Sequence, residues 1–394
     1  MNINAKLKDK KNLLSLITLI TLFFSACDGD NPVEVRNKAI KNLYDQGKIR
    51  IAVANNMTTR KSDQWNGLLL AKKKLEENGS FDKEIELVRY DDKGTVVDGT
   101  QVAYEISRDK SISIVIGHGY SDISLSTSLI YQYYGILMFN VGSTLPKLTE
   151  RNNPILFRNI PNDNVFGARI AHICEEYNFN RVLVYYLNMA SATSLANRFE
   201  LNVADKNRNI TIVSRESYDS STSEADINRQ IKRWKKNYVF DAIFLAGVNP
   251  QVGKIVRLIR NNDLTCPILG ADYFDVDAFT STLTEKDDGK IFTVSNFDDS
   301  STYPPFLEFH NSFVGEYNEE PDLEALQAYD ALIVIAKAIS QAGSAEPDKI
   351  AEVLKREVWK EAAGPYMFND HGDVSNRHLV TKIFKDGGFV IVDR

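Results

Sequence analysis

Glycines and hydroxyl side chains gather in a short segment where a strand-like run gives way to a helical pattern. This segment, GHGYSDIS, spans residues 117–124 and follows the mostly apolar residues 111–116. Ser121 stands where the helix would begin, and the free N–H groups and positive dipole end of a helix N-terminus favour an anion. Gly117 and Gly119 would let the backbone approach a ligand closely. The segment therefore indicates an anion site, although a capping serine in a tight turn would give the same pattern.

A second segment of this kind, GSTLPKLT, spans residues 142–149 and follows the apolar run GILMFN. Gly142 leaves room for a ligand, Ser143 and Thr144 supply hydroxyls, and the proline stiffens the turn. In open parallel sheets, ligands bind outside the carboxyl ends of the strands. We therefore expect Ser121 and Thr144 to bracket a carboxylate, with an ordinary polar loop as the alternative.

An acidic residue follows a strand in the second half of the chain. Asp272 belongs to GADYFD, residues 270–275, which comes after CPIL. A carboxylate at such a strand end suits an ammonium group, because charge-assisted hydrogen bonds are strong. The alternative is a loop aspartate that caps a short helix, with Asp275 sharing that work.

Strands and helices alternate along the chain from residue 48 onward. Apolar runs such as IRIAVA, at 49–54, are separated by single helical segments, and the alternation restarts after Pro161. Strands joined by single helices form parallel sheets that are covered on both faces. The predicted fold is therefore α/β, with two similar lobes, each a parallel sheet flanked by helices. The last residues also predict a hairpin, with its turn at Asp386 and the two glycines that follow.

The N-terminal residues have the pattern of a secretory signal. Lysines precede the apolar residues 13–24, a run too short to span a bilayer comfortably. Ser25 and Ala26 directly before Cys27 resemble a bacterial lipobox. That resemblance implies a signal peptide over residues 1–26 and a diacylated Cys27 that anchors the mature chain to a membrane. An ordinary signal with a chance cysteine is the alternative. The polar residues 27–47 would form a tether.

Composition and motifs exclude several classes of function. The net charge of −6 and the lack of a basic stripe argue against nucleic-acid binding. The five histidines are scattered, and HExxH, GxSxG and P-loop motifs are lacking. We therefore expect no enzymatic activity, no metal site and no cofactor. Cys174 and Cys266 allow either a disulfide or two buried thiols, and the sequence leaves both open.

The two hydroxyl-rich segments also carry a family resemblance. Over VIGHGYSDIS and GILMFNVGSTLPKLT the chain resembles the leucine/isoleucine/valine-binding proteins, which are type I periplasmic binding proteins of ABC transporters. The similarity continues through IRIAVA, VRYDDKG, YDALIVIAKAISQAGS, PDKIAEVLK and GPYMFNDHGD, and so covers residues 48–394. It implies two lobes that are joined by three hinge crossings and close around a ligand.

The resemblance also implies roles for individual residues. Ser121 matches the serine that binds the ligand's α-carboxylate in the family, and Thr144 matches a threonine that contacts both carboxylate and ammonium. Gly142 matches a position that contributes backbone groups. Asp272 falls where the family has an acidic partner for the ammonium group.

The residues that would close over the ligand depart from the family pattern. A tyrosine expected after the first strand of lobe two is replaced by Ser191, an aromatic position is Val248, and the first loop is the shorter, polar segment 55–64. We expect Thr58, Tyr120 and Ser191 to line the altered pocket. We therefore expect the ligand to be an amino acid or a related small carboxylate, whose side chain the sequence does not identify.

The resemblance places the three crossings near Pro161, Asn296 and Gly364. Lobe one would comprise residues 48–160 with 297–364, and lobe two would comprise 161–296 with 365–394.

The predicted function is that of a lipid-anchored solute-binding protein in the periplasm or another extracytoplasmic space. It would capture its ligand between the lobes and deliver it to an ABC transporter permease. The alternative is a receptor module of the same fold that reports the ligand to a separate membrane partner.

Overall fold

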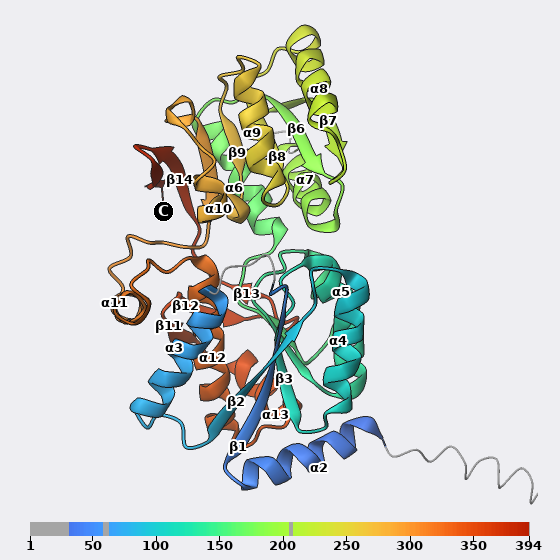
Figure 1. Ribbon diagram of the computed structural model, residues 1–394, viewed down its shortest axis with the longest axis vertical. Helices are drawn as coiled ribbons and strands as arrows, with labels where there is room; N and C mark the ends of the chain where they lie inside the picture. The colour runs from blue at the N-terminus through green and yellow to red at the C-terminus, as the bar shows by residue number, and fades with distance from the viewer. Residues whose placement is uncertain (1–30, 58–62, 205–207, 394) are drawn as a thin grey trace, which may run out of the picture.

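Two lobes, each built around its own sheet, make up the computed structural model, which describes residues 31–57, 63–204 and 208–393 (Figure 1). The predicted Thr58 and Cys27, and the whole predicted signal peptide, lie outside these residues. The two-lobed α/β fold is confirmed. Across the described residues, no helix combines the length and apolar character that a membrane crossing requires.

Lobe one contains a five-stranded parallel sheet with the order β2-β1-β3-β4-β5. Successive side chains of β1 pack on opposite faces: Ile51 and Val53 join the core under α3 and α12, whereas Ala52 and Ala54 join the core under α4 and α5. The strands of this sheet are β1 (Lys48–Asn55), β2 (Glu84–Asp91), β3 (Ile112–Gly117), β4 (Leu137–Asn140) and β5 (Leu156–Arg158). The helices are α3 (Asp63–Glu77), α4 (Val96–Arg108), α5 (Ser121–Tyr134), α11 (Pro304–Tyr317), α12 (Leu323–Ala342) and α13 (Pro347–Arg356), with the short η1 (Pro146–Leu148).

Lobe two contains a seven-stranded sheet with the order β15-β14-β10-β9-β8-β6-β7. Its parallel part is extended by the predicted C-terminal hairpin, which adds β14 and β15 as antiparallel strands. The strands are β6 (Arg181–Leu187), β7 (Thr211–Tyr218), β8 (Ala242–Ala246), β9 (Ile268–Gly270), β10 (Ile291–Ser295), β14 (Val380–Lys385) and β15 (Gly388–Asp393). The helices are α6 (Asp163–Glu176), α7 (Ala190–Val203), α8 (Glu224–Asn237), α9 (Gln251–Asn261) and α10 (Asp277–Thr280), with η2 (Asp272–Phe274) and η3 (Glu285–Asp287).

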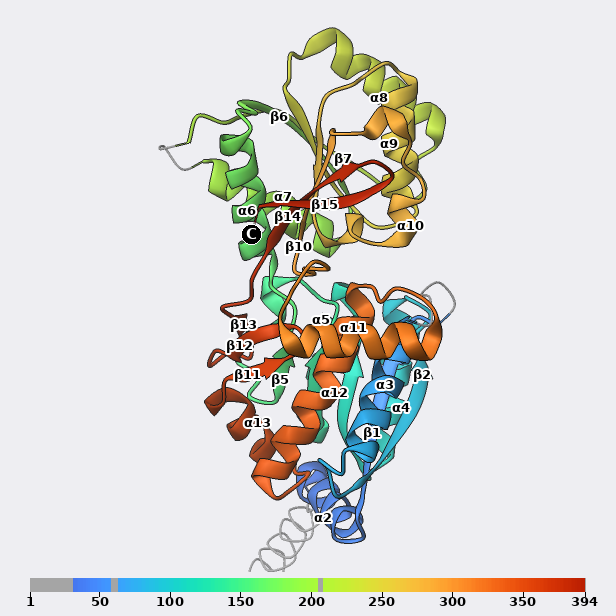
Figure 2. The same cartoon turned by 90° about the vertical axis from the view of Figure 1, so that its left-hand side faces the viewer.

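The chain crosses between the lobes three times, and the third crossing lies later than predicted. The first crossing follows β5, the second follows β10, and the third joins β13 (Val374–Ser375) to β14 (Figure 2). Gly364 begins β12 (Gly364–Phe368), which pairs with β11 (Trp359–Glu361) and β13 in a small sheet of lobe one. The prediction near Gly364 is wrong because the alternate side chains Tyr366 and Phe368 are buried in the lobe-one core.

A helix replaces most of the predicted tether. α2 (Pro32–Asp45) begins at Pro32, after Asn31 caps its first turn. Arg36 is fully buried beneath lobe one, and its guanidinium donates to the carbonyls of four residues at distances of 2.6–2.8 Å. Three of these residues, Ser107, Asp109 and Tyr134, lie at the C-terminal ends of α4 and α5, and the fourth, Ile112, begins β3. Burial lowers the pKa of Arg36 to about 10, so the group stays charged at neutral pH.

Arg36→Ala should lower the free energy of unfolding by about 2–4 kcal/mol, because buried carbonyls at two helix ends lose a charged donor. Urea unfolding of both proteins measures the difference. Lys41→Ala on the same helix is the control, since its exposed pair with Asp45 should contribute little to stability. Equal effects of the two substitutions would show that α2 is not part of the folded lobe.

Candidate ligand-binding site

The side chain of Asn140 joins the two predicted ligand segments. Asn140 is the buried last residue of β4, beside the end of β3. Its amide nitrogen donates to the carbonyls of Gly117 and His118, at 3.2 and 2.9 Å, and to the Ser124 hydroxyl. Its amide oxygen accepts from the N–H groups of residues 142 and 143, at 3.1 and 2.6 Å. The strand ends therefore form one rigid unit.

The start of α5 has no side-chain cap among the described residues. Ser121 is its first helical residue, and Tyr120 occupies the capping position, where no side chain of the described residues caps the helix. The interpretation of Ser121 as a capping serine is therefore wrong. The Ser143 hydroxyl donates to the Ser121 oxygen at 3.0 Å, so the two hydroxyls lie together. A Cβ at Gly142 would stand 2.9 Å from the Gly119 carbonyl, so only glycine fits this approach.

Three buried, hydrogen-bonded side chains hold the loop between β3 and α5 in place. The two ring nitrogens of His118 lie 2.7 Å from an Asp92 carboxylate oxygen and 2.8 Å from the Tyr131 hydroxyl. All three residues are fully buried, and burial raises the pKa of Tyr131 well above its usual value. His118 therefore holds the loop and is not placed to meet a ligand. Its two partners are 26 and 13 residues away in the sequence, which is why pattern analysis missed them.

A buried arginine holds the second segment. The Arg158 guanidinium donates to the carbonyls of Ser143 and Leu145, at 3.2 and 2.7 Å, and to the Thr149 hydroxyl at 2.9 Å. Its Nε pairs with the carboxylate of Asp373, which directly precedes β13. The loop that carries Thr144 is thus connected to the chain just before the third crossing. This arginine was also missed by the sequence analysis.

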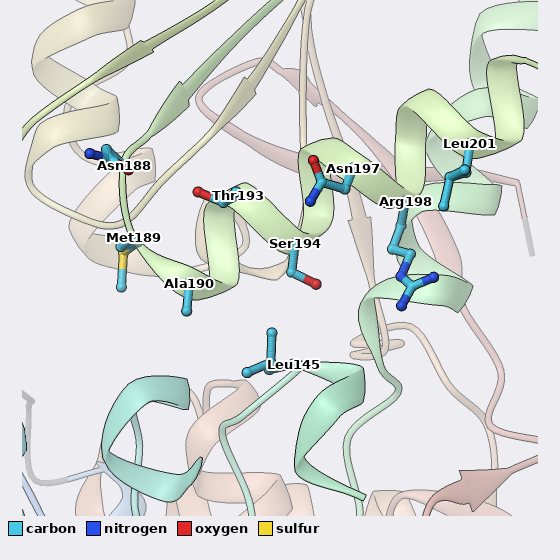
Figure 3. Close-up of a pocket in the computed structure, with 9 residues that line it drawn as sticks. All are labelled: Leu145, Asn188, Met189, Ala190, Thr193, Ser194, Asn197, Arg198 and Leu201. Carbon is cyan, nitrogen blue, oxygen red and sulfur yellow. The ribbon is translucent and has the colours of Figure 1, made fainter. Parts of the chain in front are cut away.

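Lobe two faces this loop through the first turns of α7. A cavity of about 630 Å³ separates Leu145 of lobe one from α7, and Figure 3 shows Ala190 and Ser194 on the side of the helix that faces Leu145. Met189 at the capping position also lines the cavity, and no described side chain caps this helix either. Ser191 is buried and lies outside the lining of this cavity, and its place in a ligand pocket stays a prediction.

Asp272 and Asp275 have different surroundings. Asp272 is the half-buried first residue of η2 and lies in lobe two, so a ligand could join it to Ser121 only across the space between the lobes. Asp275 lies 2.9 Å from the fully buried Lys382 ammonium group, which also contacts Asp299 at 3.0 Å. Asp275 therefore shares one buried ammonium group with Asp299.

The remaining predicted residues are placed as follows. Tyr120 is half-buried, and its ring would lie 3.1 Å from a Cβ at Gly94. Val248 packs against the core of lobe two. Cys174 and Cys266 are free thiols rather than a disulfide, and burial raises their pKa values to about 12 and about 11.

The chain is similar to a known protein family over most of its length. The family model described as periplasmic binding protein matches residues 48–388. A leucine-, isoleucine-, valine-, threonine- and alanine-binding protein of Pseudomonas aeruginosa is 25% identical over 334 residues, which cover 83% of this chain and 87% of that protein.

Solved structures show the same fold. An ABC transporter substrate-binding protein of Desulfitobacterium hafniense in complex with Leu is 26% identical, with a TM-score of 0.77 over 88% of this chain and all of that chain. A branched-chain amino acid transporter substrate-binding protein of Streptococcus pneumoniae in complex with isoleucine is 22% identical, with a TM-score of 0.79 over 88% of this chain and all of that chain.

Asn140→Ala should lower the free energy of unfolding by about 2–4 kcal/mol, because it leaves buried N–H and carbonyl groups of two loops without partners. Urea unfolding measures the change, and Asn209→Ala, at an exposed asparagine, is the matched control. A loss below about 0.5 kcal/mol would show that the loops hold their positions without the Asn140 amide.

Proposed function

Because the chain belongs to the periplasmic binding protein family, we propose that it captures an amino acid or a similar small carboxylate between its lobes and delivers it to the permease of an ABC transporter. The observation that carries this proposal is the unit built on Asn140. It holds the hydroxyls of Ser121 and Ser143 against the uncapped start of α5. Free N–H groups and a helix dipole at one point suit a carboxylate.

The ligand's α-carboxylate would bind to Ser121 and to the backbone and hydroxyl of Thr144. Its ammonium group would meet Asp272 from the opposite lobe. Closure of the hinge would then bring the two half-sites together.

The side chain of the ligand would lie near the cavity between Leu145 and α7. Leu145, Met189 and Ala190 supply apolar surface there, and Thr193 and Ser194 supply hydroxyls. A small aliphatic or hydroxylated side chain fits this mixture. The Pseudomonas aeruginosa relative, named for leucine, isoleucine, valine, threonine and alanine, supports this ligand class.

We further propose that Cys27 carries a lipid anchor that keeps the protein at an extracytoplasmic membrane surface, near its permease. The residues before Asn31 lie outside the described structure, so this proposal rests on the signal-like sequence and the lipobox-like SAC at 25–27. Mass spectrometry of the mature N-terminus tests it, and an unmodified or absent Cys27 would overturn it.

The proposed function predicts that a bound ligand raises the melting temperature of the full-length protein. A ligand that binds only the folded state adds about 2.7 kcal/mol of stability at a hundredfold excess over Kd. We expect α-amino acids to raise the melting temperature. Ser121→Ala or Thr144→Ala should lower the affinity for these ligands about 10- to 100-fold and so reduce the shift. Ser126→Ala, whose hydroxyl bonds to its own helix, should leave the shift unchanged. A folded protein that responds to no amino acid, amide or carboxylate would contradict the proposal.

Asp272→Asn should weaken the binding of amino acids at least about tenfold and leave the binding of the matched deaminated acids nearly unchanged. The reason is that only the amino acids carry the ammonium group that this carboxylate would meet. Calorimetric titration with each pair measures the two effects. Equal losses for both ligands would mean that Asp272 only shapes its loop.

A further inference from the structure

A fully buried lysine lies where two of the crossings meet lobe two. Lys382 belongs to β14, which follows the third crossing and pairs with β10, the strand that leads into the second crossing (Figure 2). Its ammonium group lies 2.9 Å from a carboxylate oxygen of Asp275 and donates to Asp299 at 3.0 Å. It also lies 5.0 Å from the centre of the Phe297 ring, which packs in the core of lobe one. One cation therefore joins a loop of lobe two to the segment of the second crossing.

The two carboxylates depend on Lys382 to different degrees. The side chain of Asp275 is 9% exposed, whereas that of Asp299 is 44% exposed. Water can therefore solvate Asp299 in the absence of the lysine, but a buried carboxylate is costly unless a cation compensates it. The ion pair with Lys382 therefore determines where Asp275 can lie.

Asp275 closes the tight turn that carries Asp272. Asp272 begins η2, and Asp275 follows the last residue of this short helix. The Asp275 N–H donates to the Asp272 carbonyl at 3.0 Å, and the Phe274 N–H donates to the Ala271 carbonyl at 2.8 Å. Residues within one hydrogen-bonded turn move together, so a displacement of Asp275 would also displace Asp272.

Two further hydrogen bonds hold this turn from within lobe two. The Thr293 hydroxyl, on β10, donates to the Ala271 carbonyl at 2.9 Å, and the Asn249 amide donates to the Tyr273 carbonyl at 2.8 Å. Both bonds fix the backbone of the turn to its own lobe. The ammonium group of Lys382 also contacts the second crossing, so it relates the position of the turn to the hinge.

We propose that Lys382 is a positioning residue, which holds the Asp272 turn in place relative to the hinge and thereby contributes to a preference for ligands with an ammonium group. This inference rests on the proposed function, because it requires Asp272 to meet the ammonium group of the ligand. Lys382 is fully buried and acts through Asp275 and the turn.

Lys382→Met tests this role, because it keeps the length of the side chain and removes its charge. The substitution leaves Asp275 without its cation, so the turn should shift toward solvent and take Asp272 with it. Calorimetric titration of the full-length protein uses leucine, valine, threonine and alanine, each beside the acid that lacks only the amino group. We expect the ratio of the two affinities to fall about fivefold, the equivalent of one hydrogen bond, while the acids bind nearly as before.

Asp275→Asn is a milder second variant, which keeps the inference testable if Lys382→Met does not fold. Lys382 retains Asp299 as its counter-charge in this variant, so little stability should be lost. The turn loses its charged attachment, and the affinity ratio should fall about threefold in the same direction.

Asp287→Asn is the matched control. Asp287 forms another buried ion pair of lobe two, 2.9 Å from Arg260, and both side chains are 4% exposed. Asp287 precedes the amino end of β10, whereas η2 follows the carboxyl end of the parallel strand β9, so the control lies at the opposite edge of the sheet. This variant should lower stability and keep the wild-type affinity ratio.

The possible failures are distinguishable. A wild-type ratio in folded Asp275→Asn, or an equal fall of the ratio in the Asp287→Asn control, would overturn the role of Lys382 and leave the proposed function intact. A wild-type ratio in Asp272→Asn would overturn this inference at its premise, while amino-acid capture would stand. A folded wild type that binds none of the four amino acids would overturn the proposed function, and this inference with it.

Discussion

The candidate site depends on the orientation of one buried amide. Asn140 faces two loops, and its nitrogen donates to one while its oxygen accepts from the other. An amide has separate donor and acceptor ends, so only one orientation satisfies both loops. Because the residue is buried, any other arrangement would leave polar groups unpaired at a considerable free-energy cost. The spacing between the start of α5 and the Thr144 loop is therefore a property of the folded sheet and does not need a ligand to form.

Arg158 extends this constraint to the hinge. Its guanidinium joins the carbonyls on both sides of Thr144 to Asp373, and Asp373 also accepts from the Thr149 hydroxyl at 2.8 Å. The Asn162 side chain, at the first crossing, reaches the same carboxylate at 3.4 Å. Two of the three crossings and the ligand loop thus share one polar network. This network therefore links the geometry of the Thr144 loop to two of the hinge crossings.

Features that depend on local patterns could be predicted, and those that depend on distant partners could not. The alternation of strands and helices predicted the two lobes, and the polar strand ends predicted the two loops that Asn140 brings together. The helix α2 was missed because its segment is polar and its burial comes from Arg36, whose acceptors lie 71–98 residues away. The third crossing was misplaced because the family resemblance gives only an approximate position, whereas the burial of Tyr366 and Phe368 depends on the rest of lobe one. The hydrogen bond from the Asp163 N–H to the Thr144 carbonyl likewise exists only in the folded chain.

The attachment of α2 to lobe one determines which lobe would stay fixed if the N-terminal end of the chain were held. Arg36 fastens this helix to the end of lobe one that is remote from lobe two, as Figure 1 shows. A load applied at the N-terminal end of the chain therefore passes into the ends of α4 and α5 and not into the hinge. If that end is held at a surface, lobe one stays still and lobe two is the arm that swings. Ligand binding would then move lobe two alone and would not reorient the whole protein.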